Sequence, residues 1–94
     1  MLGYQKLGLF LKEKRVEAGL SQPALAEKLG DVHSQFVSNW ERGLCAPPSH
    51  AFQRLISVLD LSREELVKVM VADYQSEVEF KVYKKKPKVL KRAK

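Results

Sequence analysis

The chain has 94 residues and a net charge of +6, from 17 Lys and Arg against 11 Asp and Glu, and 45% of its residues are hydrophobic. This length predicts one small domain. The proportions of hydrophobic and charged residues are typical of a soluble globular fold rather than a disordered chain. No apolar run approaches the roughly 20 residues needed to span a bilayer, the N-terminus does not resemble a signal peptide, and the single Cys45 excludes an internal disulfide, so we expect a cytoplasmic protein.

The positive charge is concentrated at the C-terminus. Seven basic and no acidic residues lie in segment 84–94, which reads KKKPKVLKRAK. Residues 1–83 therefore hold ten basic and 11 acidic residues, a net charge of −1. The function of the main body must be inferred from its residue pattern and not from its charge.

The first half of the chain predicts three short helices, over residues 5–17, 22–29 and 34–42. Each contains apolar residues three or four positions apart, as on the buried side of an amphipathic helix. Each is followed by a glycine, which readily adopts the left-handed conformation found after a helix. Ser21 precedes the second helix, where its hydroxyl can accept a hydrogen bond from an amide of the first turn.

Two further helices are predicted after the prolines at 47–48. Ser49 is expected to cap the fourth helix. Ser62 is expected to open the fifth with a capping box, in which the Glu65 side chain returns to the Ser62 amide.

The pattern changes near residue 75. Val78, Phe80 and Val82 alternate with charged residues, and this alternation is typical of a strand with one buried face. We predict a strand over 75–83, with a helix continuing to about residue 84 as the alternative. Because a lone strand leaves its backbone groups unpaired, we predict that Val78, Phe80 and Val82 mediate dimerisation with the same segment of a second copy.

The second and third predicted helices together describe a helix-turn-helix. Ala26 is small enough for the helix crossing, Gly30 supplies the turn, and Val37 and Trp40 face inward from the third helix. The outward face of the third helix then presents Ser34, Gln35, Ser38 and Asn39. Side chains of these types can hydrogen-bond base edges in the major groove of DNA.

Residues 7–66 resemble the lambda-repressor and Cro-like helix-turn-helix family, also called the XRE family. The resemblance is carried by the segments LSQ at 20–22, LAEKLG at 25–30, VSNWERG at 37–43 and LDLSREEL at 59–66. It implies an all-α bundle of five helices that binds double-stranded DNA, usually as a two-fold dimer on a palindromic site. The turn before the third helix holds one residue more than the family usually has, so the alignment is anchored at 40–43.

Individual roles follow from this resemblance. Base contacts are implied for Ser34, Gln35, Ser38 and Asn39. Phosphate contacts are assigned to Gln22, His33, Arg42 and Leu44, and structural roles to Ala26, Gly30, Val37, Trp40, Arg15 and Glu41. We single out Gln35, because an amide can pair with adenine through two hydrogen bonds. Without the motif, Gln35 and Asn39 would be interpreted as ordinary solvated residues.

The chain is accordingly divided into a helix-turn-helix domain (1–74), a dimerisation strand (75–83) and a basic tail (84–94). The tail either solubilises the protein or adds sequence-independent phosphate contacts through Lys84, Lys85 and Lys86. Since the rest of the chain points to DNA, we favour phosphate contacts.

Other classes of function find little support. The sequence shows no catalytic acid–base or nucleophile–base pair and no phosphate-binding glycine loop, so we expect neither an enzyme nor a cofactor. His33 and His50 lack a cluster of further ligands, so no metal site is expected, and Cys45 is interpreted as a passive thiol. The leading prediction is a dimeric repressor in the cytoplasm, associated with the nucleoid through DNA. The alternative is an antitoxin-like protein that binds a toxin through 71–94 and regulates its own operon.

Overall fold

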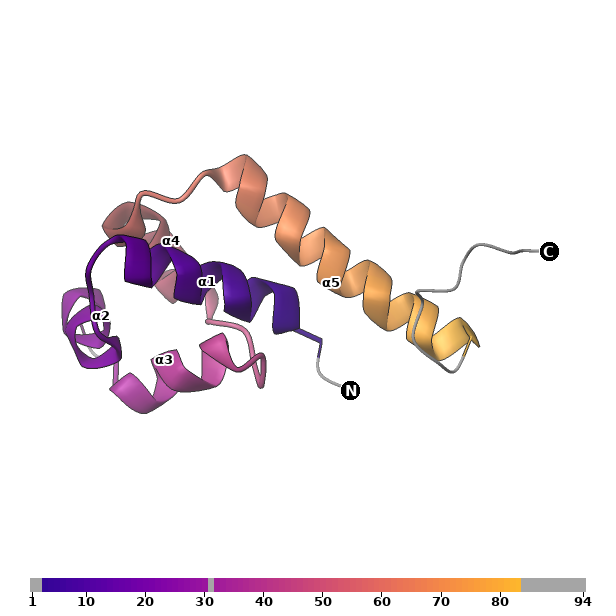
Figure 1. The fold of residues 1–94 in the computed structure, drawn as a ribbon, viewed down its shortest axis with the longest axis horizontal. Helices are drawn as coiled ribbons and strands as arrows, with labels where there is room; N and C mark the ends of the chain where they lie inside the picture. Colours follow the sequence, from indigo (N-terminus) through magenta and orange to yellow (C-terminus); the bar gives the residue numbers. More distant parts are fainter. Residues whose placement is uncertain (1–2, 31, 84–94) are drawn as a thin grey trace.

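The computed structural model describes residues 3–30 and 32–83, which form five α-helices (Figure 1). The helices are α1 (Gln5–Glu17), α2 (Gln22–Leu29), α3 (Ser34–Glu41), α4 (Ser49–Leu59) and α5 (Arg63–Tyr83). The all-α, five-helix fold predicted from the sequence is confirmed. Helices α1 and α2 have the predicted bounds, and α3 ends one residue early, with Arg42 as its C-cap.

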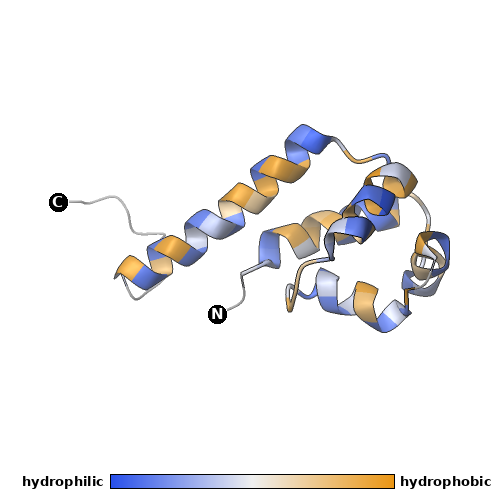
Figure 2. Cartoon of the chain, turned by 180° about the vertical axis from the view of Figure 1, so that it is seen from behind, coloured by the Kyte–Doolittle hydropathy of each residue, from blue (hydrophilic) through white to orange (hydrophobic). Residues whose placement is uncertain are grey.

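A single apolar core joins the helices. Its most deeply buried side chains are Leu7 and Leu11 of α1, Leu25 and Leu29 of α2, Val37 of α3 and Leu55 of α4. Helix α1 contacts both α3 and α5, whereas α2 contacts α3 and α4. Figure 2 shows hydrophobic and hydrophilic residues interleaved along each helix, which is the pattern of helices that bury one side only.

Serine hydroxyls cap the N-termini of two helices. The Ser21 hydroxyl accepts a hydrogen bond from the Ala24 amide at 3.1 Å, and the Ser62 hydroxyl accepts one from the Glu65 amide at 3.2 Å. These bonds satisfy amides that have no partner within their helix. The prediction for Ser49 was wrong, because Pro48 has an extended backbone and occupies the N-cap, and Ser49 is the first helical residue.

The predicted strand over 75–83 is also wrong. Helix α5 continues without interruption to Tyr83, so the proposed boundary at residue 75 falls inside it. Segment 63–83 contains neither glycine nor proline, and the Gln75 Nε2 donates to Glu79 Oε2 at 2.9 Å, one helical turn away. Such a bond between positions i and i+4 supports a helix and has no counterpart in a strand.

The helical conformation separates the three residues assigned to the strand. In a helix, positions two apart point to nearly opposite sides, so Val78 and Phe80 do not share a face. Val78 and Phe80 are 37% and 38% exposed, and Val82 is 67% exposed. Segment 75–83 is helical, so it does not form the strand that the predicted two-stranded ribbon requires. None of the described helices is long and apolar enough to cross a membrane.

Gly8 allows α1 to lie directly on the end of α3. A Cβ atom at this position would come within 2.5 Å of the Glu41 carbonyl oxygen and 2.7 Å of the Trp40 carbonyl oxygen. Both are backbone atoms, so a side chain at residue 8 requires the two helices to move apart. The close approach of α1 and α3 thus depends on glycine at position 8, which has no side chain.

Replacing Gly8 with alanine is expected to lower the free energy of unfolding by a net of about 1–2 kcal/mol. The clash with two backbone atoms costs about 2–3 kcal/mol, and the higher helix propensity of alanine returns about 1 kcal/mol. Urea unfolding followed by Trp40 fluorescence measures the change, with Leu9→Ala on the exposed side of α1 as the control. A more stable G8A variant would contradict the close approach.

Candidate nucleic-acid interface

Helices α2 and α3 are joined by a tight turn. Ala26 is 3% exposed at the helix crossing, and Gly30 has φ 101°, a conformation that favours glycine. The Val32 amide donates to the Gly30 carbonyl at 2.8 Å, and the Arg54 guanidinium of α4 donates to the Leu29 carbonyl. These contacts fix the end of α2 and the start of the turn, and so fix the direction in which α3 leaves.

One side of α3 is held in the core. Val37 is 1% exposed and Trp40 is 4% exposed, as expected for the inward positions of a helix-turn-helix. Gly43 follows the C-cap of α3 and has φ 78°. It packs closely against Gln5 at the start of α1. The opposite side of α3 therefore has a fixed position relative to the rest of the bundle.

The outward side of α3 carries two amides that are joined to each other. The Gln35 Nε2 donates to Asn39 Oδ1 at 3.0 Å, one helical turn along. Gln35 is exposed and Asn39 is half-buried. The bond uses one of the two Gln35 N–H groups and leaves its carbonyl oxygen and second N–H for another partner. These two groups are the donor and acceptor that adenine requires in the major groove.

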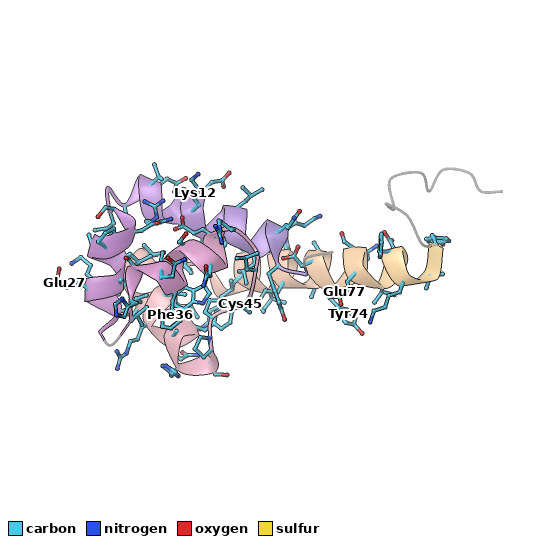
Figure 3. The ribbon with its side chains drawn as sticks, turned by 90° about the horizontal axis from the view of Figure 1, so that it is seen from below. Lys12, Glu27, Phe36, Cys45, Tyr74 and Glu77 are labelled. Atoms are coloured by element: carbon cyan, nitrogen blue, oxygen red, sulfur yellow. The ribbon has the colours of Figure 1, made fainter. Side chains whose placement is uncertain are left out.

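The other residues predicted to contact bases frame this pair. Ser34 is the first residue of α3 and Ser38 follows one turn later, and both are half-buried. Phe36, also on α3, is 49% exposed (Figure 3). The outward side of α3 is thus a mixed polar and aromatic surface.

A buried ion pair fixes the C-terminal end of α3 to α1. The Arg15 guanidinium contacts the Glu41 carboxylate through two hydrogen bonds, with Nε to Oε2 at 2.6 Å and Nη2 to Oε1 at 3.1 Å. Their side chains are 10% and 4% exposed. The hydrogen bonds to Glu41 raise the pKa of Arg15 above its ordinary value, and this outweighs the opposing effect of burial. The pair has the position implied by the family resemblance.

Two more contacts extend this ion pair into a network. The Arg15 Nη1 donates to the Leu20 carbonyl at 2.8 Å, just before α2. The Gln22 Nε2 donates to Glu41 Oε1 at 2.9 Å. Gln22 was predicted to contact phosphate, and in the structure its side chain contacts Glu41 of α3. Three helices therefore meet at the Glu41 carboxylate.

The segment after α3 differs in detail from the prediction. Arg42 is exposed at the C-cap of α3. The Leu44 amide, expected to contact phosphate, donates to the Asn39 carbonyl at 3.0 Å. This bond uses the single donor of the Leu44 amide, so a phosphate contact there would need a neighbouring group. His33 is the exposed N-cap of α3, and Lys84, Lys85 and Lys86 lie outside the described residues.

Asp73 of α5 contributes a contact that the sequence analysis missed. Its Oδ1 accepts from the Lys6 amide and its Oδ2 from the Leu7 amide, both at 2.9 Å. Asp73 is 5% exposed. A carboxylate at the N-terminus of a helix satisfies free amides and interacts favourably with the helix dipole. Its spacing of seven from the buried Leu66 was a signal that Asp73 faces inward.

The described residues show no group of three or more His, Cys, Asp or Glu that could hold a metal ion. Cys45 is an exposed free thiol in the segment after α3 (Figure 3). Around α3, this surface carries the amides of Gln35 and Asn39, the hydroxyls of Ser34 and Ser38, and the exposed His33, Phe36 and Arg42.

Comparison with known protein families finds a match to a family described as Helix-turn-helix, over residues 11–66. The match covers more than half of the chain and includes α2, the turn and all of α3. Comparison with curated proteins and with solved structures finds no match.

Proposed function

Because this chain belongs to the lambda-repressor and Cro-like family of helix-turn-helix DNA-binding regulators, we propose that it represses transcription as a homodimer bound to a palindromic DNA site. In this proposal α3 lies in the major groove. Gln35, Asn39, Ser34 and Ser38 face the bases, and Arg42, Gln22 and His33 contact the phosphates on either side. Contacts to phosphate position the protein, whereas contacts to base edges select the sequence.

The observation that carries the proposal is the joined pair of amides on α3. Gln35 and Asn39 hold each other on the outward side of α3, while Val37, Trp40 and Glu41 fix its inward side. A side chain that is already positioned loses less conformational entropy when it binds. The pair is therefore suited to distinguish one base pair from another.

The direct test is selection of bound duplexes from a random library by the full chain. We expect one enriched sequence made of two inverted half-sites, because a two-fold dimer reads the same sequence twice. Placing the selected site within a promoter is expected to lower expression of a reporter gene when the protein is present. Enrichment of no sequence, or activation of the reporter, would contradict the proposal.

Replacing Gln35 with alanine is expected to weaken binding to the selected site by about 1–3 kcal/mol and to relax the preference at one base pair of each half-site. Binding to random duplexes should stay unchanged, since phosphate contacts are kept. Fluorescence anisotropy at fixed salt measures both affinities, with Gln53→Ala on α4 as the matched control. An equal loss on selected and random duplexes would show that Gln35 does not read bases.

A second candidate is the antitoxin-like function predicted through residues 71–94. The exposed side chains of Val71 and Tyr74 favour it, because both lie in the part of α5 assigned to a toxin. In that case the chain would form a stable complex with a second, different protein and relieve its effect on growth.

A further inference from the structure

An exposed aromatic side chain lies on the first turn of α3. Phe36 is 49% exposed, whereas the other large apolar residues of this helix, Val37 and Trp40, are 1% and 4% exposed. The Phe36 amide donates to the His33 carbonyl at 2.9 Å, which closes the first turn and fixes the backbone at this position. Single exposed apolar residues are ordinary in proteins, so the surroundings of the ring decide whether it has a role.

Phe36 lies beside the joined amides of α3. Figure 1 places α3 along the lower edge of the bundle, and Figure 3, which looks from below, shows Phe36 on this side. Residues three apart are neighbours on a helix surface, so Phe36 adjoins Asn39, and Asn39 accepts the hydrogen bond from Gln35. The N-terminal residues of a recognition helix are the ones that contact base edges. Phe36 is therefore placed where α3 meets the bases under the proposed function.

The chemistry of a phenyl ring restricts what Phe36 can recognise there. The ring has no hydrogen-bond donor or acceptor of the kind that Gln35 and Asn39 supply. The major-groove edges of the base pairs present hydrogen-bonding groups and one apolar group, which is the 5-methyl group of thymine. Contact between a phenyl ring and this methyl group removes apolar surface from water on both sides. Thymine is thus the base whose edge matches Phe36.

We propose that Phe36 contacts the 5-methyl group of a thymine in each half-site and is a specificity-determining residue. This contact rests on the proposed function, because it requires α3 to lie in the major groove. Adjacent residues of a helix point about 100° apart, so Phe36 and Gln35 reach different base pairs. Gln35 then pairs with an adenine, and Phe36 selects a thymine in a neighbouring base pair.

A protein partner is the alternative occupant of this surface. Leu44 is 46% exposed in the segment after α3, and together with Phe36 it would form the apolar part of such an interface. However, the α3 residues around the ring are polar, namely the exposed His33 and the joined Gln35 and Asn39. A protein interface has a more apolar centre than this. A duplex edge, which combines hydrogen-bonding groups with methyl groups, matches the mixed surface.

The first test removes single methyl groups from the DNA. Each thymine of the duplex selected by the full chain is replaced in turn with deoxyuridine, which lacks only the 5-methyl group. At one position of each half-site we expect the dissociation constant to rise about fourfold, the affinity ratio that corresponds to one buried methylene, and elsewhere to change less than about twofold. Replacing both of these thymines should raise it about 15-fold, since the half-sites are separate. Fluorescence anisotropy measures the dissociation constants.

The second test removes the ring from the protein. Phe36→Ala should bind the thymine and deoxyuridine duplexes with equal affinity, because the group that senses the methyl is gone. Phe36→Leu keeps an apolar side chain and should retain a preference for thymine. Leu9→Ala on α1, where the leucine is 62% exposed, is the matched control and should keep the wild-type ratio. Circular dichroism checks the folding of all variants. An F36A variant that keeps the full preference for thymine would overturn the contact.

The third test separates the methyl group from the rest of the base. The thymine that responds in the first test is replaced with cytosine or 5-methylcytosine, each paired with guanine. The wild-type chain should bind the 5-methylcytosine duplex about fourfold more tightly than the cytosine duplex, and F36A should not distinguish them. The wild-type ratio should be the same at low and high salt, because an apolar contact releases no counterions. Equal binding by the wild type, or weaker binding to the methylated duplex, would overturn the contact.

The outcomes separate the thymine contact from the proposed function. A selected site in which no thymine responds to deoxyuridine would overturn the contact and leave sequence recognition by α3 standing. Selection of no sequence at all would contradict the proposed function and the contact with it. An F36A variant that loses affinity equally for both duplexes would also overturn the contact. Sedimentation equilibrium then shows whether Phe36 instead joins two copies of the chain, because F36A would dimerise more weakly in that case.

Discussion

Replacing Glu41 with alanine is expected to lower the free energy of unfolding by about 3–5 kcal/mol. The substitution leaves the Arg15 guanidinium buried without a counter-charge, and it also removes the acceptor of the Gln22 amide. The expected loss is a large part of the total stability of a domain this small, which is about 5–15 kcal/mol. Urea unfolding followed by circular dichroism measures it.

The matched control is Glu17→Ala. Glu17 forms an ion pair with Lys14 at 3.7 Å on the surface, and its side chain is 67% exposed. Exposed pairs contribute less than about 1 kcal/mol, so this variant should remain close to wild type. A loss below about 1 kcal/mol in E41A as well would mean that the Arg15–Glu41 contact gives the fold no more than an exposed pair does.

Replacing Asp73 with alanine is expected to destabilise the chain by about 2–4 kcal/mol. The buried Leu7 amide loses its acceptor at about 1–3 kcal/mol, and the partly buried Lys6 amide loses its acceptor at about 1 kcal/mol. The same contact is the only side-chain tie between α5 and the backbone of α1 among the described hydrogen bonds. Asp73→Asn should lie between wild type and D73A, because an amide offers one acceptor oxygen in place of two.

Amide hydrogen exchange measures the predicted effect of D73A locally, at the start of α1. The amides of Lys6 and Leu7 should exchange faster in D73A by more than the change in global stability accounts for. Glu79→Ala is the control on the same helix, because it removes only an exposed hydrogen bond to Gln75. Unchanged exchange at Lys6 and Leu7 would contradict the cap.

The parts of the fold that depend on local chemistry could be predicted from the sequence. Ser21 and Gly30 define the two ends of α2 through hydrogen bonding and backbone conformation within a few residues. The alternation of Val78, Phe80 and Val82 was misleading, because it matches a strand over only five positions, and no glycine or proline separates these residues from the helix that precedes them. The longer pattern that begins at Val67 resolves the choice in favour of the helix.

Contacts between distant segments could not be predicted in the same way. The outward position of Gln35 and Asn39 on α3 follows from helical spacing, but the hydrogen bond between them depends on their rotamers. Gly8 is unremarkable in the sequence, since only the approach of α3 shows why a side chain is excluded there. The DNA contacts themselves stay predictions that the family resemblance implies.

The hydrogen bond between Gln35 and Asn39 makes these two positions interdependent. A substitution of Asn39 also releases Gln35 from its rotamer, so under the proposed function it changes what both residues read. The base preferences of a half-site are then not a sum of separate contributions from each amino acid. Evolution of a new binding site along this lineage would proceed through paired replacements at 35 and 39, with single replacements passing through intermediates of low specificity.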